Sequence, residues 1–296
     1  MDLSFDLIAI DGKLLFRAGQ KITPKKISAI GRQAPAVRLI PLSDSRALTD
    51  LEHSFKHPRY RTIFSPREIN AEILQTMRHV ALPETVVREF RKMKRVMPYT
   101  FRHILRTSIL STKLSLDEQI RKDFDSVLMA ESSLMHDLGK SRIPVRILNK
   151  VSPLTAEEYA IMKSHPLTGF VLLHYYFGPG HRIVEDPSFE HHERLDGTGY
   201  PRRVRKMNKY SQVIAVADVF DAILSSRPYR REPFTMRAAL DHLLDESRAG
   251  RLNPVFVLLL ISYARKSKPA LRVLRIAEKK RDAPPRRNMY GKIRSN

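Results

Sequence analysis

The chain has 296 residues, of which 42% are hydrophobic, and its 53 Lys and Arg outnumber 31 Asp and Glu to give a formal net charge of +22. This length and composition allow one large domain or two modest ones with a real core, and they exclude an intrinsically disordered chain. The absence of cysteine excludes disulfide scaffolds, thiolate catalysis and cysteine-based metal sites, while the positive charge favours polyanionic partners.

The distribution of apolar residues also indicates where the protein is located. Residues 1–5 contain no basic segment followed by an apolar run, so we expect no secretory signal and a cytoplasmic location. The longest apolar run, residues 255–261, is far shorter than the roughly twenty residues that a bilayer-spanning helix needs. We therefore predict no transmembrane segment.

The N-terminal part alternates short apolar runs with turn signals. Apolar residues occupy 5–10, 14–16 and 36–40, and Asp-Gly separates the first two runs. This pattern predicts a small sheet with one helix near residues 23–30. We predict a small α+β accessory or regulatory domain over residues 1–65, with the boundary in the polar stretch 50–61, and expect a signalling protein as its partner.

From residue 66 onward the apolar residues recur at helical spacing. Thr155 with Glu158 predicts a capping box at the start of one helix, and Gly250 predicts the end of another. The predicted helices cover 69–80, 98–116, 126–138, 155–164, 167–177, 211–225, 235–247 and 254–266. We predict a helical domain over residues 66–278. Residues 279–296 are strongly basic and predict a flexible tail that could bind nucleic acid.

Several histidine and aspartate residues of this helical part lie at apolar positions or at helix ends. His136 and Asp137 are adjacent at the end of an apolar window, so both can reach one metal ion, and the carboxylate can bridge to a second. His165 precedes Pro166, which fixes it at a corner of the chain. Such positions favour metal ligation through nitrogen and oxygen.

Further residues of the same kind follow. His191 and His192 precede Glu193 and the turn-rich stretch 196–201, and Asp218 lies in an apolar helical window where an unpaired carboxylate would be costly. Taken singly, His103 and His174 read as ordinary partly buried side chains, and Asp218 could simply pair within a core. Taken together, the set predicts a metal site.

Residues 98–265 resemble the HD-GYP domain, a branch of the HD metal-dependent phosphohydrolases. The matching motifs are His136-Asp137-Leu138-Gly139-Lys140, Ile143-Pro144, Ile147-Leu148, Leu154-Thr155 with Glu158, His165-Pro166 with Gly169, His191-His192-Glu193, Asp196-Gly197, Gly199-Tyr200-Pro201, Ala217-Asp218-Val219-Phe220-Asp221-Ala222 and Arg227-Pro228-Tyr229-Arg230. The resemblance implies a mainly α fold, in which an HD-type helical bundle follows the small α+β N-terminal domain.

The resemblance also implies roles for individual residues. One metal ion would be held by His103, His136, Asp137 and Asp218, and the other by Asp137, His165, His191 and His192. Asp137 and Lys140 would be catalytic, and Glu193 and Asp221 would orient the ligands. Substrate would contact Lys140, Gly199, Tyr200, Pro201, Arg227 and Arg230. The cofactors would be two divalent transition metal ions, iron first and manganese next, since this histidine-rich set lacks sulfur.

The implied activity is hydrolysis of the phosphodiester bonds of cyclic di-GMP, to pGpG and/or GMP, by a hydroxide that bridges the two metals. Some members of the family hold a third metal with a glutamate one turn before the first histidine, where this chain has Tyr99. A third metal is therefore not expected. Two alternatives stay open: a cyclic di-GMP sensor or nucleic-acid-binding module with little or no catalysis, and an HD phosphohydrolase that acts on another nucleotide.

Overall fold

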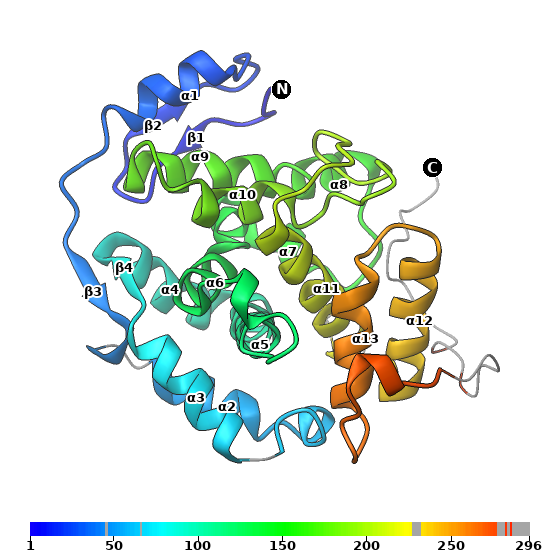
Figure 1. The fold of residues 1–296 in the computed structure, drawn as a ribbon. Helices are drawn as coiled ribbons and strands as arrows, with labels where there is room; N and C mark the ends of the chain where they lie inside the picture. The colour runs from blue at the N-terminus through cyan, green and yellow to red at the C-terminus, as the bar shows by residue number, and fades with distance from the viewer. Residues whose placement is uncertain (45–46, 66, 227–231, 277–281, 283–284, 286–296) are drawn as a thin grey trace.

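The computed structural model describes residues 1–296 except 45–46, 66, 227–231, 277–281, 283–284 and 286–296. The fold is mainly helical, with a small α+β region at the N-terminus, as predicted (Figure 1). The α-helices are α1 Pro24–Gly31, α2 Ala47–Phe55, α3 Arg67–Arg78, α4 Glu84–Val96, α5 Pro98–Ser115, α6 Ser126–Met135, α7 Val145–Leu148, α8 Ala156–Met162, α9 His165–Phe177, α10 Arg182–Glu190, α11 Lys209–Leu224, α12 Met236–Arg248 and α13 Pro254–Tyr263. The strands are β1 Leu7–Ile8, β2 Leu14–Phe16, β3 Leu39–Pro41 and β4 Ala81–Pro83.

Helix α5 lies at the centre of the bundle. Pro98 opens it at a position where a missing N–H costs nothing, and from His103 onward almost every residue is buried. It packs against α6, α11, α4 and α2, so its sides are covered by helices from both ends of the sequence (Figure 1). A residue on α5 can therefore meet residues of α11 more than a hundred positions later.

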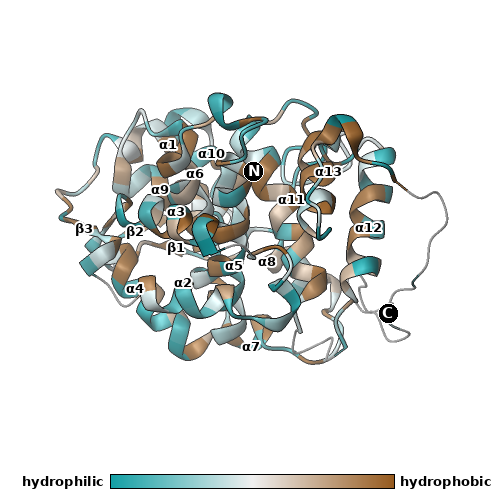
Figure 2. Ribbon diagram, turned by 60° about the horizontal axis from the view of Figure 1, so that its bottom comes forward, coloured by the Kyte–Doolittle hydropathy of each residue, from teal (hydrophilic) through white to brown (hydrophobic). Residues whose placement is uncertain are grey.

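The C-terminal helices match their predicted windows. In α13 the hydrophobic residues extend along the whole helix, which is buried apart from a few positions (Figure 2). The Thr235 side chain caps α12, and Gly250, with φ +72°, follows its last residue as the predicted stop. The predicted capping box of Thr155 and Glu158 is also present, at the start of α8.

The N-terminal strands do not form the single sheet that the sequence predicted. β1 pairs with β2 in the expected hairpin, with Leu7 opposite Phe16, and α1 follows with Thr23 as its cap. β3 instead pairs with β4, with Ile40 opposite Leu82. The reason is that α1 runs along α9 and carries the chain away from the hairpin, so β3 reaches the strand between α3 and α4 (Figure 1).

The polar stretch 50–61 is ordered structure packed on the helical bundle. It contains most of α2 and the 3₁₀ helix η2, Pro58–Tyr60. Leu51, Phe55 and Tyr60 are buried, and α2 contacts α5. The charges in this stretch lie on the exposed side of an amphipathic helix, which explains why the sequence alone suggests a domain boundary here. The division of the chain into domains stays a prediction.

The β1–β2 hairpin and α1 lie against α9. The Asp11 N–H donates to the Tyr176 hydroxyl at 3.1 Å, and the Tyr175 hydroxyl donates to the Asp11 carboxylate at 3.1 Å. A Cβ on Gly31 of α1 would lie 2.5 Å from Nε2 of His174, so only glycine allows this close approach. His174 thus serves packing, as its ordinary interpretation in the sequence suggested.

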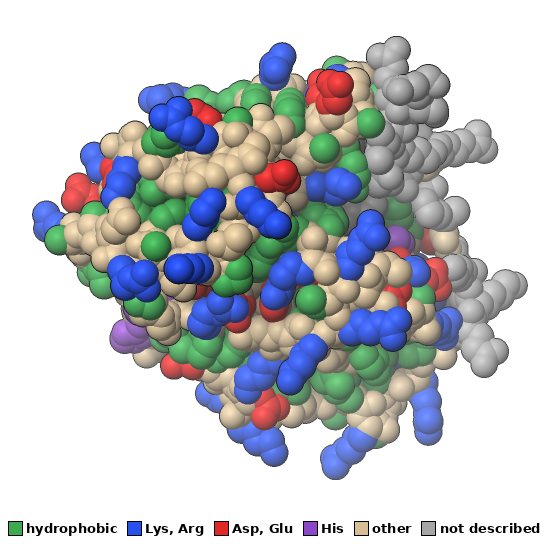
Figure 3. All heavy atoms as spheres, turned by 90° about the horizontal axis from the view of Figure 1, so that it is seen from above, with side chains coloured by type: hydrophobic (Ala, Val, Ile, Leu, Met, Phe, Trp, Pro, Cys, Tyr) green, Lys and Arg blue, Asp and Glu red, His purple; other side chains and the backbone are tan. Residues whose placement is uncertain are grey.

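The basic charge is spread over the surface. On the face shown in Figure 3, Lys and Arg side chains are scattered across the whole surface and Asp and Glu are sparse. Among the described residues no helix has the length and apolar character needed to cross a membrane.

Candidate metal centre

The predicted ligands come from separate elements that converge in the core. His103 lies on α5, His136 and Asp137 follow α6 directly, and Asp218 lies on α11. His165 is the first residue of α9, whereas His191 and His192 follow the end of α10. All are buried except His192, which is half-buried.

Three of these residues form one cluster, the α5–α6–α11 group, consisting of His103, His136 and Asp218. Their candidate ligand atoms all lie within 4.8 Å of one another. Nε2 of His103 is 2.8 Å from Oδ1 of Asp218, and the rings of His103 and His136 meet edge to face at 5.7 Å. Two imidazoles and one carboxylate are suitable ligands for a divalent transition metal.

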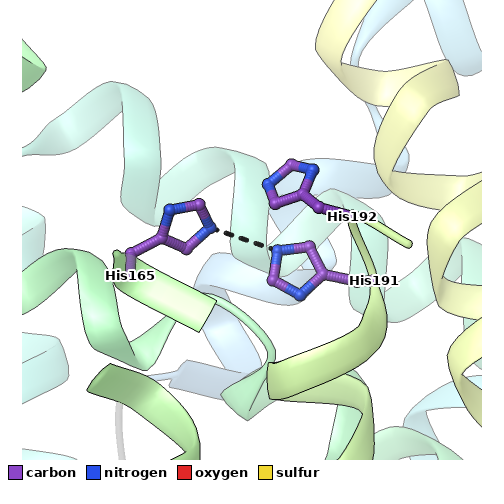
Figure 4. Close-up of side chains that lie close together, drawn as sticks. All are labelled: His165, His191 and His192. Atoms are coloured by element: carbon purple, nitrogen blue, oxygen red, sulfur yellow. Dashed lines mark hydrogen bonds between the residues drawn. The ribbon is translucent and has the colours of Figure 1, made fainter. Parts of the chain in front are cut away.

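Three other residues form a second cluster, the α9–α10 group, consisting of His165, His191 and His192. Their candidate ligand atoms also lie within 4.8 Å of one another. Nε2 of His165 is 3.3 Å from Nε2 of His191 (Figure 4). The ring of His192 meets the ring of His165 edge to face, with centroids 4.9 Å apart. This group consists of imidazoles alone.

Asp137 lies between the two groups, and each of its carboxylate oxygens faces one of them. Oδ2 is 3.7 Å from Nε2 of His103 and 3.5 Å from Nε2 of His136. Oδ1 is 3.4 Å from Nε2 of His165 and 3.6 Å from Nε2 of His191. The carboxylate is thus placed where a ligand shared by two ions would be.

Hydrogen bonds at Nδ1 fix the orientation of most of these rings. Nδ1 of His136 donates to the Ser133 carbonyl at 2.6 Å, Nδ1 of His165 to the Met162 carbonyl at 2.6 Å, and Nδ1 of His191 to the Pro187 carbonyl at 2.9 Å. A carbonyl oxygen can only accept, so the proton must sit on Nδ1. The lone pair on Nε2 is then available to a metal ion.

The charges of the cluster suit metal binding. Burial opposes ionisation of Asp137, yet Lys140 and His136 hold its pKa well below the usual value. Burial likewise opposes ionisation of Asp218, and the hydrogen bond from His103 holds its pKa well below the usual value. Burial lowers the pKa of His165, His191 and His192, so these rings are neutral at pH 7. Ionised carboxylates and neutral imidazoles are the forms that bind metal.

Two buried ligand atoms also lack a partner. Nε2 of His136 and Oδ1 of Asp137 make no hydrogen bond to any described residue, and both residues have 0% exposure. Unsatisfied polar atoms at such depth are costly unless an ion or water meets them. The donor set, its charge and these two atoms all fit divalent cations.

Comparison with known proteins identifies the family. Residues 105–255, about half of the chain, match the model of the HD domain. The chain belongs to the HD domain family. This confirms the resemblance to HD phosphohydrolases drawn from the motifs, and all the candidate ligands except His103 lie within the matched residues.

Several curated proteins are similar to this HD domain. A protein from Thermotoga maritima named cyclic di-GMP phosphodiesterase is 37% identical over 166 residues, which cover 55% of this chain and 43% of that protein. The cyclic di-GMP phosphodiesterase response regulator RpfG of Xanthomonas campestris is 40% identical over 46% of this chain and 36% of its own length. The 3'3'-cGAMP-specific phosphodiesterase 1 of Vibrio cholerae is 32% identical over 52% of this chain and 36% of its own length. The chain spans less than half the length of these relatives.

Lys140 of the HD domain lies beside Asp137. Its Nζ is 2.6 Å from Oδ2 of Asp137, and its side chain is 14% exposed at the edge of the cluster. The turn that carries it, η4 (Leu138–Arg142), packs tightly on α9, because a side chain at Gly139 would collide with the His165 carbonyl oxygen. The glycine therefore brings Asp137, Lys140 and His165 together.

The loop after the histidine pair lies next to the α9–α10 group. The Tyr200 ring stacks on His192, with centroids 4.7 Å apart and planes at 17°. A side chain at Gly199 would collide with the backbone of Glu193 and Arg194, so this glycine serves close packing. The structure places Tyr200 beside a candidate ligand, and Pro201 follows it in the same loop.

Glu193 contacts the loop rather than a histidine ring. Its carboxylate accepts from the backbone N–H of Arg202 at 2.7 Å and of Val204 at 3.2 Å. Its positioning effect thus falls on the segment that follows Tyr200 and Pro201. Asp221 differs, because its Oδ2 lies 2.6 Å from Nδ1 of His103 and so orients that ring, as the resemblance implied.

Sequence reasoning missed Tyr60. This fully buried residue of η2 donates its hydroxyl hydrogen bond to Oδ1 of Asp221. No motif surrounds Tyr60, and the polar residues beside it favoured a domain boundary. The only signal was an aromatic residue in an otherwise charged stretch.

Three further positions from the sequence analysis remain to be placed. Arg227 and Arg230 lie outside the described residues, so their contact with substrate stays a prediction. Tyr99, where a ligand for a third ion would be expected, is 41% exposed and has the Arg102 guanidinium 5.0 Å from its ring centroid.

Proposed function

We propose that this chain is a metal-dependent phosphodiesterase that hydrolyses cyclic di-GMP to pGpG and/or GMP. The observation that carries the proposal is the position of Asp137, whose two oxygens face two histidine-containing groups at 3.4 to 3.7 Å. Membership of the HD domain family and similarity to proteins named cyclic di-GMP phosphodiesterases support it.

The cofactors we propose are two divalent transition metal ions, with iron as the first choice and manganese as the next. His103, His136 and Asp218 would hold one ion, His165, His191 and His192 would hold the other, and Asp137 would be shared. Two such ions acidify a bound water and neutralise charge on phosphoryl oxygens. Magnesium fits poorly because it prefers oxygen ligands.

The residues around the groups would bind and orient the substrate. Lys140 holds a positive charge at the edge of the cluster, where it can stabilise negative charge that develops on a phosphoryl oxygen. Tyr200 presents an aromatic ring beside His192, and Gly199 and Pro201 shape its loop. Arg227 and Arg230 would contact the phosphates or guanines, as the motif implies.

The test is a turnover assay with defined metal content. The full chain is stripped with a chelator, reloaded with Fe(II) without oxygen or with Mn(II), and incubated with cyclic di-GMP, and the nucleotides are then separated. We expect pGpG or GMP from the wild type and none from Asp137→Ala. The matched control is Asp241→Ala, since Asp241 pairs with Arg237 on α12. Absence of hydrolysis with either metal would refute the proposal.

A second substrate is favoured by one comparison, because a relative from Vibrio cholerae is named for 3'3'-cGAMP. The same assay with that dinucleotide compares the two values of kcat/KM. A higher value for 3'3'-cGAMP would keep the reaction and change the substrate. Tight binding of cyclic di-GMP without any product would instead favour the sensor alternative.

The proposal extends to the rest of the chain. Residues 1–65 would act as an accessory or regulatory domain that binds a signalling protein, residues 66–278 as the catalytic domain, and residues 279–296 as a basic tail able to bind nucleic acid. A cytoplasmic location, where cyclic dinucleotides are signals, belongs to the same proposal. Salt-sensitive binding of random DNA that disappears when residues 279–296 are deleted would test the role of the tail.

A further inference from the structure

Tyr60 connects the segment before the HD domain to the metal centre. It lies on η2, outside residues 105–255 that match the family, and its side chain has 0% exposure. Its ring meets Phe220 of α11 edge to face at 6.1 Å and lies 6.1 Å from Phe64. These rings hold the hydroxyl in one place.

A continuous series of hydrogen bonds runs from this hydroxyl to a candidate metal ligand. The Tyr60 hydroxyl donates to Oδ1 of Asp221, and Oδ2 of Asp221 lies 2.6 Å from Nδ1 of His103. Nε2 of His103, on the other side of the ring, faces Asp218 at 2.8 Å. The orientation of His103 therefore depends on a carboxylate that Tyr60 holds.

The carboxylate of Asp221 is held at Oδ1 by two hydroxyl groups. The Ser225 hydroxyl donates to the same oxygen at 2.8 Å, and Arg106 donates to the Ser225 hydroxyl oxygen at 2.8 Å. Burial and the Asp221 carboxylate raise the pKa of Tyr60 well above its usual value, so the hydroxyl keeps its proton and donates. Removing the Tyr60 donor weakens the hold on the carboxylate and therefore the orientation that it gives to His103.

We propose that Tyr60 is a positioning residue for the α5–α6–α11 group. Its hydroxyl fixes Asp221, and Asp221 fixes the tautomer and ring orientation of His103, so Tyr60 sets the metal affinity of this group. The inference rests on the metal centre of the proposed function and goes beyond it, because it makes metal affinity depend on a segment outside the HD domain. Such outer partners typically change metal affinity by about 10- to 100-fold.

The experiment is a metal titration of Tyr60→Phe, which removes the hydroxyl and keeps the ring. Mn(II) affinity is measured by competition with a chromogenic chelator, and Co(II) absorption reports the coordination of each ion. We expect affinity at one of two sites to fall about 10- to 100-fold, with the other site unchanged. The affected site should be the one that His103→Ala abolishes.

The matched control is Tyr176→Phe. Tyr176 is equally buried, at 1% exposure, and its hydroxyl also makes a hydrogen bond, to the Asp11 backbone against the N-terminal hairpin. Both substitutions remove one hydroxyl from a buried tyrosine, yet only Tyr60 is connected to a candidate ligand. We expect Tyr176→Phe to leave both affinities and the Co(II) spectrum unchanged.

A second measurement tests the route. In a double-mutant cycle, Asp221→Asn should weaken the same site, and adding Tyr60→Phe to it should produce little further loss. Unchanged affinity in Tyr60→Phe, equal losses in Tyr60→Phe and Tyr176→Phe, or full additivity with Asp221→Asn would each overturn the inference. Because no substrate is present, a chain that binds two ions but hydrolyses no cyclic dinucleotide would refute the proposed activity and leave this result standing.

Discussion

The two candidate metal groups face one carboxylate but differ in charge. The α5–α6–α11 group contains the ionised Asp218, whereas the α9–α10 group contains three imidazoles whose pKa values are lowered by burial. A buried negative charge a few ångströms from a divalent cation attracts it strongly. We therefore expect the two sites to differ in metal affinity, with the tighter site at the α5–α6–α11 group.

The groups also differ in what holds their histidines. In the α5–α6–α11 group His136 donates to a main-chain carbonyl but His103 is oriented by the Asp221 carboxylate. In the α9–α10 group no histidine has a carboxylate partner of this kind among the described residues, because His165 and His191 donate to main-chain carbonyls and His192 stacks on Tyr200. A carboxylate partner makes an imidazole a stronger ligand than a carbonyl does. Main-chain partners, in contrast, cannot be removed by substituting a side chain. The orientation of His165 and His191 therefore depends on the backbone conformation.

The largest effect is expected from Asp137→Ala, because both groups share this residue. Without its two oxygens each group loses a ligand and the negative charge between the ions, so we expect loss of both ions and of detectable turnover. Elemental analysis after desalting and the cyclic di-GMP assay measure this. Retention of both ions would show that the groups do not share Asp137.

The next effect separates the groups. His103→Ala should leave about one ion per chain, bound at the α9–α10 group, and His192→Ala should leave about one ion at the α5–α6–α11 group, more tightly held. Either change should lower turnover by at least about 100-fold, since two ions act together. His174→Ala is the control, because His174 is buried and contacts Glu185 at 3.0 Å but belongs to neither group. Loss of both ions from either variant would mean that the sites are not separable.

Much of this site could be predicted from sequence, because its signals are local. His136 and Asp137 are adjacent, and His165 precedes a helix-breaking proline, so each position is unusual within a few residues. The central helices were equally clear, since α13 is a nearly continuous apolar run and α5 carries apolar residues at helical spacing. The sequence pattern therefore predicted those features that depend on neighbouring residues of a single segment.

The remainder depended on contacts between distant segments. Tyr60 contacts Asp221 although 161 positions separate them in the sequence. Strand β3 pairs with β4 only because α1 leads the chain away from the hairpin. Helix α10 contains Pro187, which hides it from a helical pattern although the Pro187 carbonyl is what orients His191. The contact of Glu193 with the loop was also not predictable, because its neighbour His192 suggested a role toward the histidines.

A smaller effect is expected from Lys140→Met, which should strengthen metal binding but slow turnover. Nζ of Lys140 lies 2.6 Å from the Asp137 oxygen that faces the α5–α6–α11 group, so its positive charge competes with a metal ion there. Removing the charge should tighten that site while turnover falls by about 10- to 100-fold, since a cation near the phosphoryl oxygens is lost. Mn(II) titration and steady-state kinetics measure the two effects. Weaker metal binding together with slower turnover would instead make Lys140 a structural support of Asp137.

The smallest effect is a difference in pH dependence between the groups. Burial alone would lower the pKa of His136, but the carboxylates of Asp137 and Asp218 outweigh it and raise this pKa above the ordinary value. Below its pKa the ring carries a proton that a metal ion must displace, which costs about tenfold in apparent affinity per pH unit. Burial lowers the pKa of His165, His191 and His192, so these rings take up protons only at lower pH than His136 does.

Lowering the pH from about 7.5 to about 6 should therefore weaken metal binding by the α5–α6–α11 group more than by the α9–α10 group, with a slope that approaches about tenfold per pH unit below the pKa of His136. The single-site variants His192→Ala and His103→Ala report each group alone, so Mn(II) titrations of both at several pH values give the two slopes directly. A steeper slope for the α9–α10 group would show that its histidines are protonated near neutral pH despite their burial. The difference in affinity between the two sites would then widen in acid, because the weaker group would also be the one that protons empty first.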